Sequence, residues 1–183
     1  SISDVFTESM TAGTAARLRV SYEDLKVIRP DIIVLSTSGW GTLGPYQGYA
    51  ALGAALDGFS GHHALRGYPD SDPTMTTLVQ HTDSSAALMG AFAILAALNY
   101  KRRSGIGQWI DLSQSETFLP HLGSNLMDYV MNNRFPSPVG NKHQFHVPHG
   151  CYRCSGNDNW VVIHVTSHDE WVSLCKITSN HRW

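Results

Sequence analysis

The residue with the clearest chemical potential is Asp83, a single carboxylate at the start of a long apolar segment. Small and apolar residues run from Ala86 to Leu98 without proline, which predicts a helix. Asp83 and its neighbours Thr82 and Ser84 are all good helix N-caps. The positive end of a helix also keeps a carboxylate ionised, which is its nucleophilic form. Capping and nucleophilic chemistry therefore compete for Asp83, and helix physics alone favours capping.

A second candidate is the glycine-rich stretch GWGTLG at residues 39–44, which follows the apolar run at residues 31–37. Its spacing matches the G-x-G-x-x-G pattern of dinucleotide sites, in which the third glycine opens a helix. Here Pro45 follows at once, and no strand ending in an acidic residue lies about twenty residues on. A glycine loop at the carboxyl end of a parallel strand is nevertheless a common ligand site. The pattern is weak evidence for a dinucleotide, whereas its position makes Gly39 and Gly41 candidate ligand contacts.

A third candidate is the stretch HVPHGCYRC, which offers the metal-ligand types His146, His149, Cys151 and Cys154 within nine residues. Structural zinc sites usually pair C-x-x-C with a second pair of ligands some distance away. Because these four residues are crowded together, we favour half-buried cysteines and expect no metal. A zinc-binding structural module built on the two cysteines is the alternative.

The composition indicates a soluble globular protein. The chain has 183 residues, of which 42% are hydrophobic and 15% charged, and its formal net charge is -2. The small net charge argues against nucleic acid as a partner. Three cysteines in a chain without a secretory signal indicate reduced thiols and a cytoplasmic location. No apolar run is expected to span a membrane, because the best candidate breaks at Asn99 and ends in three basic residues.

The expected fold class is α/β, with a partial Rossmann-like parallel layer followed by part of a small α+β domain. Apolar runs at residues 31–37 and 108–113 predict buried parallel strands, and helical patterns lie between and around them. We predict a partial large Rossmann-like domain at residues 1–126, a linker at 127–147 and a partial small domain at 148–183. The other predicted elements are helices at 11–20, 21–28, 49–56 and 115–132, a loop at 57–77, a hairpin around 150–165 and a helix from Ser167.

The order of these segments resembles the family III CoA-transferases, which include formyl-CoA transferase and carnitine CoA-transferase. The related 2-methylacyl-CoA racemases share the fold. The resemblance covers nearly the whole chain, and each of its pieces is modest alone but specific in this order. The pieces are SYEDLKVIRPDIIVLSTSGWGTLGPY, TDSSAALMGAFAILAALNYKRRSGIGQWIDLS, the dipeptide Gly140-Asn141 and PHGCYRCSGNDNWVVI.

The resemblance implies that Asp83 is a nucleophile. In the family, the aspartate that opens the long helix attacks an acyl-CoA thioester and forms an acyl-aspartyl anhydride. The CoA thiolate then attacks the aspartyl carbonyl, which leaves an aspartyl-CoA thioester that passes CoA to an acceptor acid. Coenzyme A would therefore be a substrate, with acyl-CoA and carboxylic acids as partners. Amides of the glycine loop would stabilise the oxyanions.

Two further residues carry over from the resemblance. The stretch TESMTAGTAARL resembles the start of a family helix, in which Arg17 would lie against the CoA adenine. The racemases place a histidine and an aspartate where this chain has Tyr49 and Ala50. Racemisation needs two proton carriers, so a transferase is favoured over a racemase. Tyr49 would line the channel for pantetheine or the acyl group.

Members of this family are considerably longer than 183 residues, so the sequence is expected to be a central piece of such a protein. A sheet without its neighbouring strands exposes edges and apolar faces, which predicts a homo-oligomer. The alternative from another function class is a non-catalytic CoA-binding or assembly module that keeps the fold without turnover.

Overall fold

The computed structural model describes residues 3–75 and 79–179 of the chain. The chain forms two compact units, one of residues 1–64 and 77–136 and the other of residues 65–76 and 137–183. The first is called the sheet unit and the second the hairpin unit. The domain division predicted from the sequence did not assign residues 65–76 to the hairpin unit.

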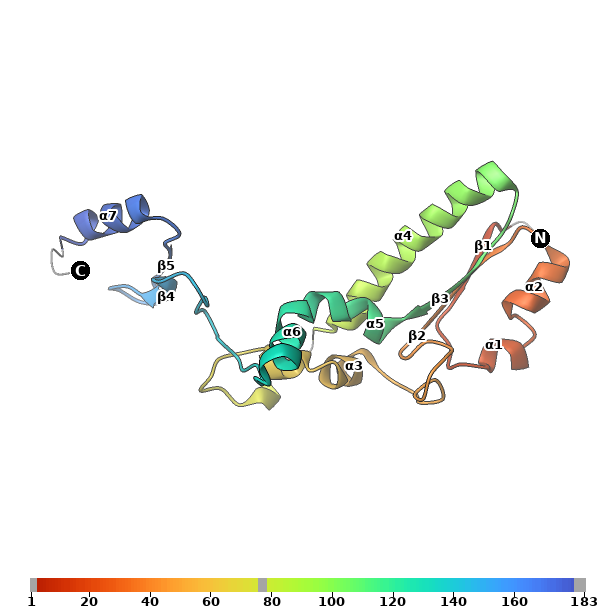
Figure 1. The fold of residues 1–183 in the computed structure, drawn as a ribbon, viewed down its shortest axis with the longest axis horizontal. Helices are drawn as coiled ribbons and strands as arrows, with labels where there is room; N and C mark the ends of the chain where they lie inside the picture. The colour runs from red at the N-terminus through yellow and green to blue at the C-terminus, as the bar shows by residue number, and fades with distance from the viewer. Residues whose placement is uncertain (1–2, 76–78, 180–183) are drawn as a thin grey trace. The chain divides into compact units, whose positions relative to one another are not determined.

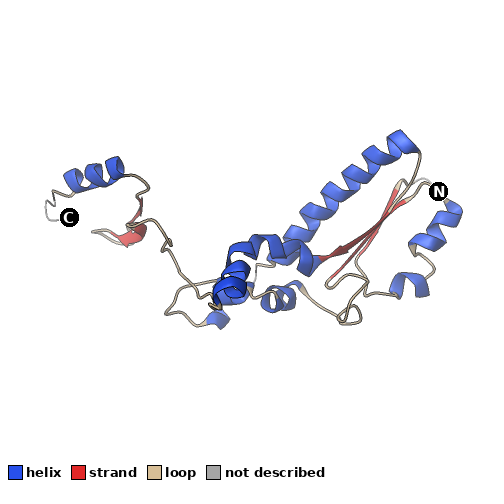
Figure 2. Ribbon diagram, in the orientation of Figure 1, coloured by secondary structure: helices blue, strands red, loops and turns tan. Residues whose placement is uncertain are grey.

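The sheet unit is built on three parallel strands, β1 (Val5–Glu8), β2 (Ile33–Ser38) and β3 (Trp109–Ser113), in the order β1-β2-β3 (Figures 1 and 2). The central strand is the most buried, and its Ile33 and Val34 side chains are almost fully enclosed. The α/β class and the two predicted parallel strands are confirmed, but β3 is buried only at Leu112 and Ser113. Strand β1 was not predicted, because only four residues pair with β2.

Two short helices connect β1 to β2. Helix α2 (Tyr22–Ile28) matches the helix predicted at residues 21–28 and begins with a capping box, in which Ser21 and Asp24 exchange hydrogen bonds. Helix α1 (Thr14–Arg17) is much shorter than the helix predicted at residues 11–20. It begins after Gly13, whose backbone is left-handed, and the chain turns left-handed again at Arg19 with φ of 58°. These two left-handed residues limit α1 to about one turn.

Helix α4 (His81–Ser104) runs along the sheet and contacts both β2 and β3 (Figure 1). Its small residues permit this close approach. A Cβ added at Gly90 would lie 3.1 Å from Cδ2 of Leu35 on β2, so only glycine fits without displacement. The core beneath the helix comprises Leu35, Ala86 and Leu112, with Ile94 and Ile110 packed against it.

Helix α4 is also long and apolar enough to span a membrane by length and composition, which differs from the expectation that no segment would qualify. Its best 18-residue window has a mean hydropathy of 1.2, and 22% of that window is buried. The core helix of a soluble protein meets the same criterion. The contacts of α4 with β2 and β3 are those of a helix that covers a parallel sheet.

An ionic cluster ties the C-terminal end of α4 to the beginning of the sheet. The Lys101 ammonium lies 3.0 Å from Oδ1 of Asp4 and 2.7 Å from Oδ2 of Asp31. Arg29 contacts the same two carboxylates, at 2.5 Å and 3.0 Å. Hydrogen bonds from Lys101 and then from Arg29 lower the pKa of Asp31 to about 2. The cluster therefore stays charged over the whole neutral range.

The remaining helices of the sheet unit lie near the carboxyl ends of the strands (Figure 1). The helix predicted at residues 49–56 begins later, at Gly53, and extends into the predicted loop. The helix predicted at residues 115–132 is divided into three parts, with a 3-10 turn at Pro120. The elements are α3 (Gly53–Phe59), η1 (His62–Leu65), α5 (Gln114–Phe118), η3 (Leu119–Leu122) and α6 (Gly123–Asn132).

The hairpin unit contains the predicted antiparallel pair, β4 (His149–Arg153) and β5 (Trp160–His164), with His149 opposite His164. Helix α7 (His168–Ile177) follows and is capped by Ser167, whose hydroxyl accepts from the Glu170 amide. The unit also includes the 3-10 turn η2 (Pro73–Met75). The predicted hairpin and the predicted helix after Ser167 are both confirmed.

We predict that Lys101→Ala lowers the melting temperature of the chain by a few degrees, because the carboxylates of Asp4 and Asp31 lose one of their two cations. Arg102→Ala is the matched control, because Arg102 is exposed on the same turn. It should change stability by less than about 0.5 kcal/mol.

The Lys101 effect should depend on pH in a defined direction. Because the folded pKa of Asp31 is lowered from 3.8 to about 2, the contribution is present above 3.8 and is lost as the pH falls toward 2. Melting temperatures of wild type and Lys101→Ala should therefore converge across that window. A gap that stays constant down to pH 2 would contradict an ionic origin.

Candidate active site

The first turn of helix α4 is capped from another helix. Gln80 occupies the N-cap position, and its side chain makes no capping hydrogen bond. Instead the carboxylate of Asp57, on α3, accepts the His81 amide at 3.1 Å and the Thr82 amide at 3.0 Å. Asp83 is the third residue of the helix. The capping interpretation of Asp83 is therefore wrong, because Asp57 fills that role.

The Asp57 carboxylate remains ionised although its side chain is completely buried. Burial raises the pKa of this group, but hydrogen bonds from the Thr82 and His81 amides outweigh that effect and lower the pKa to about 2. A helix N-terminus is also the place where a buried negative charge is best tolerated. Asp57 thus joins α3 to α4 through a charged cap.

Asp83 is half-buried and lines a cavity of about 260 Å³. Its carboxylate lies directly against Gly53 at the start of α3. A Cβ added at Gly53 would collide with Oδ2 of Asp83 and would lie 2.8 Å from its Cγ. The absence of a side chain at Gly53 therefore makes room for the Asp83 carboxylate.

This cavity, called the Asp83 cavity, lies where the three parallel strands end. Its walls come from the segments that follow the carboxyl ends of the strands, including Ser9 after β1, Gly39 after β2 and Gln114 after β3. Tyr49, from the loop before α3, also lines it. Ligands of open α/β sheets bind at this edge. The structure thus brings three predicted site residues together, Asp83, Gly39 and Tyr49.

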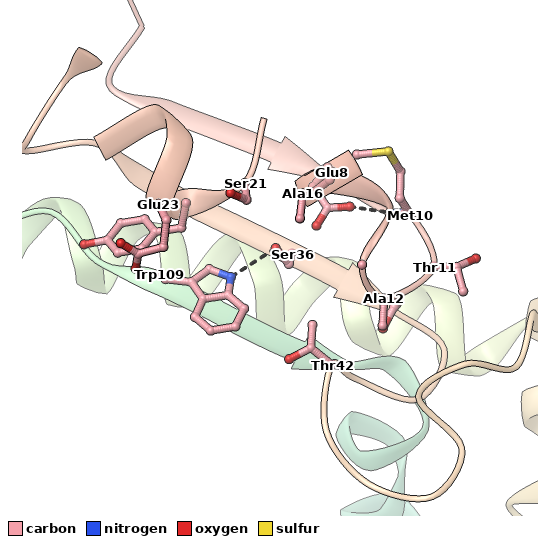
Figure 3. A pocket seen from close by; sticks show the side chains of 14 residues that line it. Glu8, Met10, Thr11, Ala12, Ala16, Ser21, Glu23, Ser36, Thr42 and Trp109 are labelled. Carbon is pink, nitrogen blue, oxygen red and sulfur yellow. Dashed lines mark hydrogen bonds between the residues drawn. The ribbon is translucent and has the colours of Figure 1, made fainter. Parts of the chain in front are cut away.

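A second cavity, of about 220 Å³, adjoins the first and shares Met10, Thr11 and Ser38 with it. Figure 3 shows this second cavity between the α1–α2 segment and β3. The indole of Trp109 forms one wall and donates a hydrogen bond to the Ser36 hydroxyl at 3.1 Å. Most of the other lining side chains are small, so the hollow has room for an extended ligand.

Two other predicted contact residues lie outside these walls. Arg17 is exposed on α1, and its guanidinium donates to the Thr14 hydroxyl at 2.8 Å. Gly41 is buried in the glycine loop, with φ of 78° and a Cβ position 3.3 Å from that of Ser113. Gly41 therefore serves the turn itself. Neither residue is among those that line the two cavities.

The glycine loop is held in place by β3. The backbone amide of Thr42 donates to both carboxylate oxygens of Asp111 at 3.2 Å, and the Thr42 hydroxyl also contacts that carboxylate. The amide of Ser115 donates to the Gly39 carbonyl at 3.1 Å. No helix follows the third glycine directly, so the loop does not have the form of a dinucleotide fingerprint.

Sequence reasoning missed Asp57 and Gly53. Asp57 was placed in a predicted loop, and its bonding partners lie 24 and 25 residues further along the chain. Local capping rules search within a few residues of the helix start, so they had no signal for it. A completely buried aspartate one turn after a glycine becomes informative only when α3 and α4 are packed together.

The cysteine region also differs from expectation. Cys151 and Cys154 are exposed free thiols rather than half-buried ones, because the two-stranded sheet leaves both at its surface. His146 instead approaches His164, with a nitrogen–nitrogen distance of 3.1 Å. Within residues 3–75 and 79–179, no set of three metal-ligand side chains converges around these cysteines.

Comparisons with known proteins all indicate the same family. The model of CoA-transferase family III matches residues 1–183. Succinate–glutarate CoA-transferase of Agrobacterium fabrum is 30% identical over 174 residues, which is 95% of this chain and 43% of that protein. Human succinyl-CoA:glutarate CoA-transferase is 28% identical over 179 residues, or 96% of this chain and 40% of that protein.

Two solved structures have a similar fold. A CAIB/BAIF family protein from Brucella suis has a TM-score of 0.83 and 28% identity, covering 97% of this chain and 46% of that chain. Rv3272 from Mycobacterium tuberculosis has a TM-score of 0.77 at 20% identity, which supports the fold alone, and covers 96% of this chain and 44% of that chain. The chain thus spans less than half the length of the relatives that it matches.

We predict that Gly53→Ala displaces the Asp83 carboxylate and destabilises the chain by roughly 1–3 kcal/mol, because the added methyl group overlaps it. Gly58→Ala, in the same helix, is the matched control, since its Cβ would meet only Nδ1 of His63 at 3.6 Å. That change should be neutral or stabilising by up to about 1 kcal/mol through helix propensity. Thermal melts of both variants check this, and equal melting temperatures would contradict the close contact at Gly53.

Proposed function

This chain belongs to CoA-transferase family III, as the sequence resemblance implied, and we propose that Asp83 is the nucleophile of a CoA transfer between carboxylic acids. The observation that carries the proposal is the capping of α4 by Asp57. Because Asp57 satisfies the first amides of the helix, Asp83 is not needed there and faces the Asp83 cavity.

In the proposed reaction an Asp83 oxygen attacks the thioester carbonyl of the donor acyl-CoA. The carbon–sulfur bond breaks, CoA leaves as a thiolate and an acyl-aspartyl anhydride remains. The thiolate attacks the Asp83 carbonyl and expels the donor acid, which forms the aspartyl-CoA thioester. The acceptor carboxylate attacks this thioester and forms a second anhydride with release of CoA thiolate. The thiolate attacks the acceptor carbonyl, which yields the new acyl-CoA and restores the Asp83 carboxylate.

Several features of the site support this reaction. Asp83 lies in the first turn of a 24-residue helix, at the end where the helix dipole attracts anionic groups. The lack of a side chain at Gly53 lets the Asp83 carboxylate lie against α3, and the Asp83 cavity leaves room for a thioester beside it. The glycine loop contributes Gly39 to the same cavity, and a backbone amide from it would stabilise each oxyanion.

The lining of the Asp83 cavity favours transfer over racemisation. Asp83 is the only carboxyl or imidazole group among its described lining residues, which include Tyr49 and Ala50. A racemase must remove a proton on one face of a carbon and deliver one on the other, which takes two positioned carriers. We therefore place Tyr49 in the channel for the acyl group or pantetheine.

The second cavity is proposed to take part of the CoA molecule. It adjoins the Asp83 cavity and is formed by small residues of the α1 segment and the Trp109 indole. Arg17 lies on the same helix, and its exposed guanidinium is free to reach an adenine beyond the cavity mouth. The names of the relatives make short dicarboxylic acids the first donors and acceptors to test.

A non-catalytic CoA-binding or assembly module is the second candidate. One observation favours it, the exposed apolar face of α4, where Leu88, Phe92 and Leu95 are each more than two-thirds exposed. Apolar surface of this kind marks an interface. It supports the homo-oligomer expected from the sequence, with or without catalysis.

Asp83→Asn is the decisive change for this proposal. Because an amide does not attack a thioester, the variant should lose covalent capture of CoA while keeping its fold. Intact-mass measurement after incubation with succinyl-CoA should show a hydroxylamine-labile CoA adduct on wild type and none on the variant. Ser84→Ala, at the exposed neighbouring position, should retain the adduct.

The other outcomes separate the two candidates. An adduct that persists in Asp83→Asn would exclude Asp83 as the nucleophile. The absence of an adduct from wild type, together with measurable CoA binding by calorimetry, would favour the non-catalytic module. Circular dichroism of each variant shows whether the fold is retained.

A further inference from the structure

Three metal-ligand side chains converge behind the Asp83 cavity, outside its walls. Asp57 lies on α3, His62 in the turn η1 that follows it, and His81 opens α4. One ligand atom from each lies within 4.8 Å of the other two. Among residues 3–75 and 79–179 this is the one group of three His, Cys, Asp or Glu side chains that meets this distance.

The distances in this group fit a shared metal ion better than hydrogen bonds. The Nδ1 atoms of His62 and His81 both lie 3.5 Å from Oδ2 of Asp57. Good hydrogen bonds between such atoms are shorter, at about 2.7–3.2 Å. Ligands bound to one tetrahedral Zn²⁺ at about 2.0–2.1 Å lie roughly 3.3–3.4 Å apart. The two nitrogen–oxygen distances are therefore within a few tenths of an ångström of that spacing, and the two imidazoles supply ligand atoms within 4.8 Å of each other.

The two imidazole rings also pack against each other. Their centroids are 4.5 Å apart at an interplanar angle of 75°, so the rings of His62 and His81 meet edge to face. Phe118 packs against His62 at 4.8 Å and helps to fix its ring. His62 and His81 are partly buried and Asp57 is completely buried, so the group is shielded without being closed.

The types of ligand in this group also favour a bound metal ion. The carboxylate of Asp57 accepts the His81 and Thr82 amides, and the two imidazoles approach the same carboxylate. One carboxylate oxygen with two imidazole nitrogens is a common ligand set for Zn²⁺ and other first-row divalent ions. A cation also compensates the charge of a completely buried carboxylate, which is otherwise costly.

We propose that Asp57, His62 and His81 form a binding site for a divalent transition metal of the Zn²⁺ type, with water in the fourth position. The ion joins α3, η1 and the first residue of α4, two residues before Asp83. Its role is to fix the helix start that presents Asp83. Binding replaces the contact of His81 Nδ1 with the Val79 carbonyl, now 3.0 Å, and His81 then coordinates as the neutral tautomer that carries its proton on Nε2.

The imidazole cluster of the hairpin unit is the competing site. His143, His146, His149 and His164 lie close together, but backbone groups occupy several of their nitrogens. Nδ1 of His143 accepts the Phe145 and His146 amides, and Nδ1 of His149 contacts the Asn141 carbonyl at 2.6 Å. No three of them bring ligand atoms within the same distance.

The test uses Zn²⁺ itself and the whole chain. Dialysed wild type should bind one equivalent of zinc by metal analysis. Zinc at a hundredfold excess over its dissociation constant should raise the melting temperature by roughly 5 °C or more. The double variant His62→Gln/His81→Gln should weaken zinc binding at least tenfold and lose the thermal shift. The matched control His146→Gln/His164→Gln should keep both.

X-ray absorption of the bound zinc supplies a second readout that does not depend on the variants. It should show only oxygen and nitrogen neighbours at about 2.0–2.1 Å, including two imidazoles, whereas cysteine ligation adds sulfur at about 2.3 Å. The proposal is overturned if wild type binds no zinc, if sulfur ligands are found, or if the control variant alone loses binding. Each measurement is independent of CoA transfer, so the outcome does not depend on the role of Asp83.

Discussion

The charged cap that Asp57 places on helix α4 is the interaction on which the rest of the site depends. Its two oxygens accept the amides of His81 and Thr82 from a completely buried position. Buried helix ends need such partners, and here the partner comes from α3. The cap fixes the start of α4 relative to α3, and it leaves Asp83 unengaged in the first turn. Without it, Asp83 would be the nearest carboxylate for the same amides.

Contacts along the rest of helix α4 fix the helix relative to the sheet. Gly90 allows the helix to lie against Leu35 on the central strand, and Lys101 fastens its other end to the carboxylates near the start of the sheet. The helix is therefore held at its beginning, middle and end by different kinds of interaction. Asp83 is consequently oriented by the whole layer rather than by its neighbours in sequence, which a nucleophile requires.

The site itself lies where parallel strands end, and its shape is set by backbone as much as by side chains. The glycine loop after β2 is tied to β3 through Thr42 and Asp111, so its position does not depend on a ligand. Gly53 makes room for the Asp83 carboxylate. Two adjoining cavities result, a polar one around Asp83 and a second beside Trp109. Because they adjoin, a long thioester substrate can extend from one into the other.

The amino-acid sequence by itself determined the α/β class, the strands at β2 and β3, the hairpin and the helices that begin near Ser21 and Ser167. These follow from local periodicity and from contacts within a few residues. It also singled out Asp83, through the order of motifs rather than through local physics, which favoured a cap. Only the tertiary structure decided that Asp57 is that cap and that Tyr49 and Gly39 share a cavity with Asp83. Those facts depend on packing between segments 24 or more residues apart, for which local propensity carries no information.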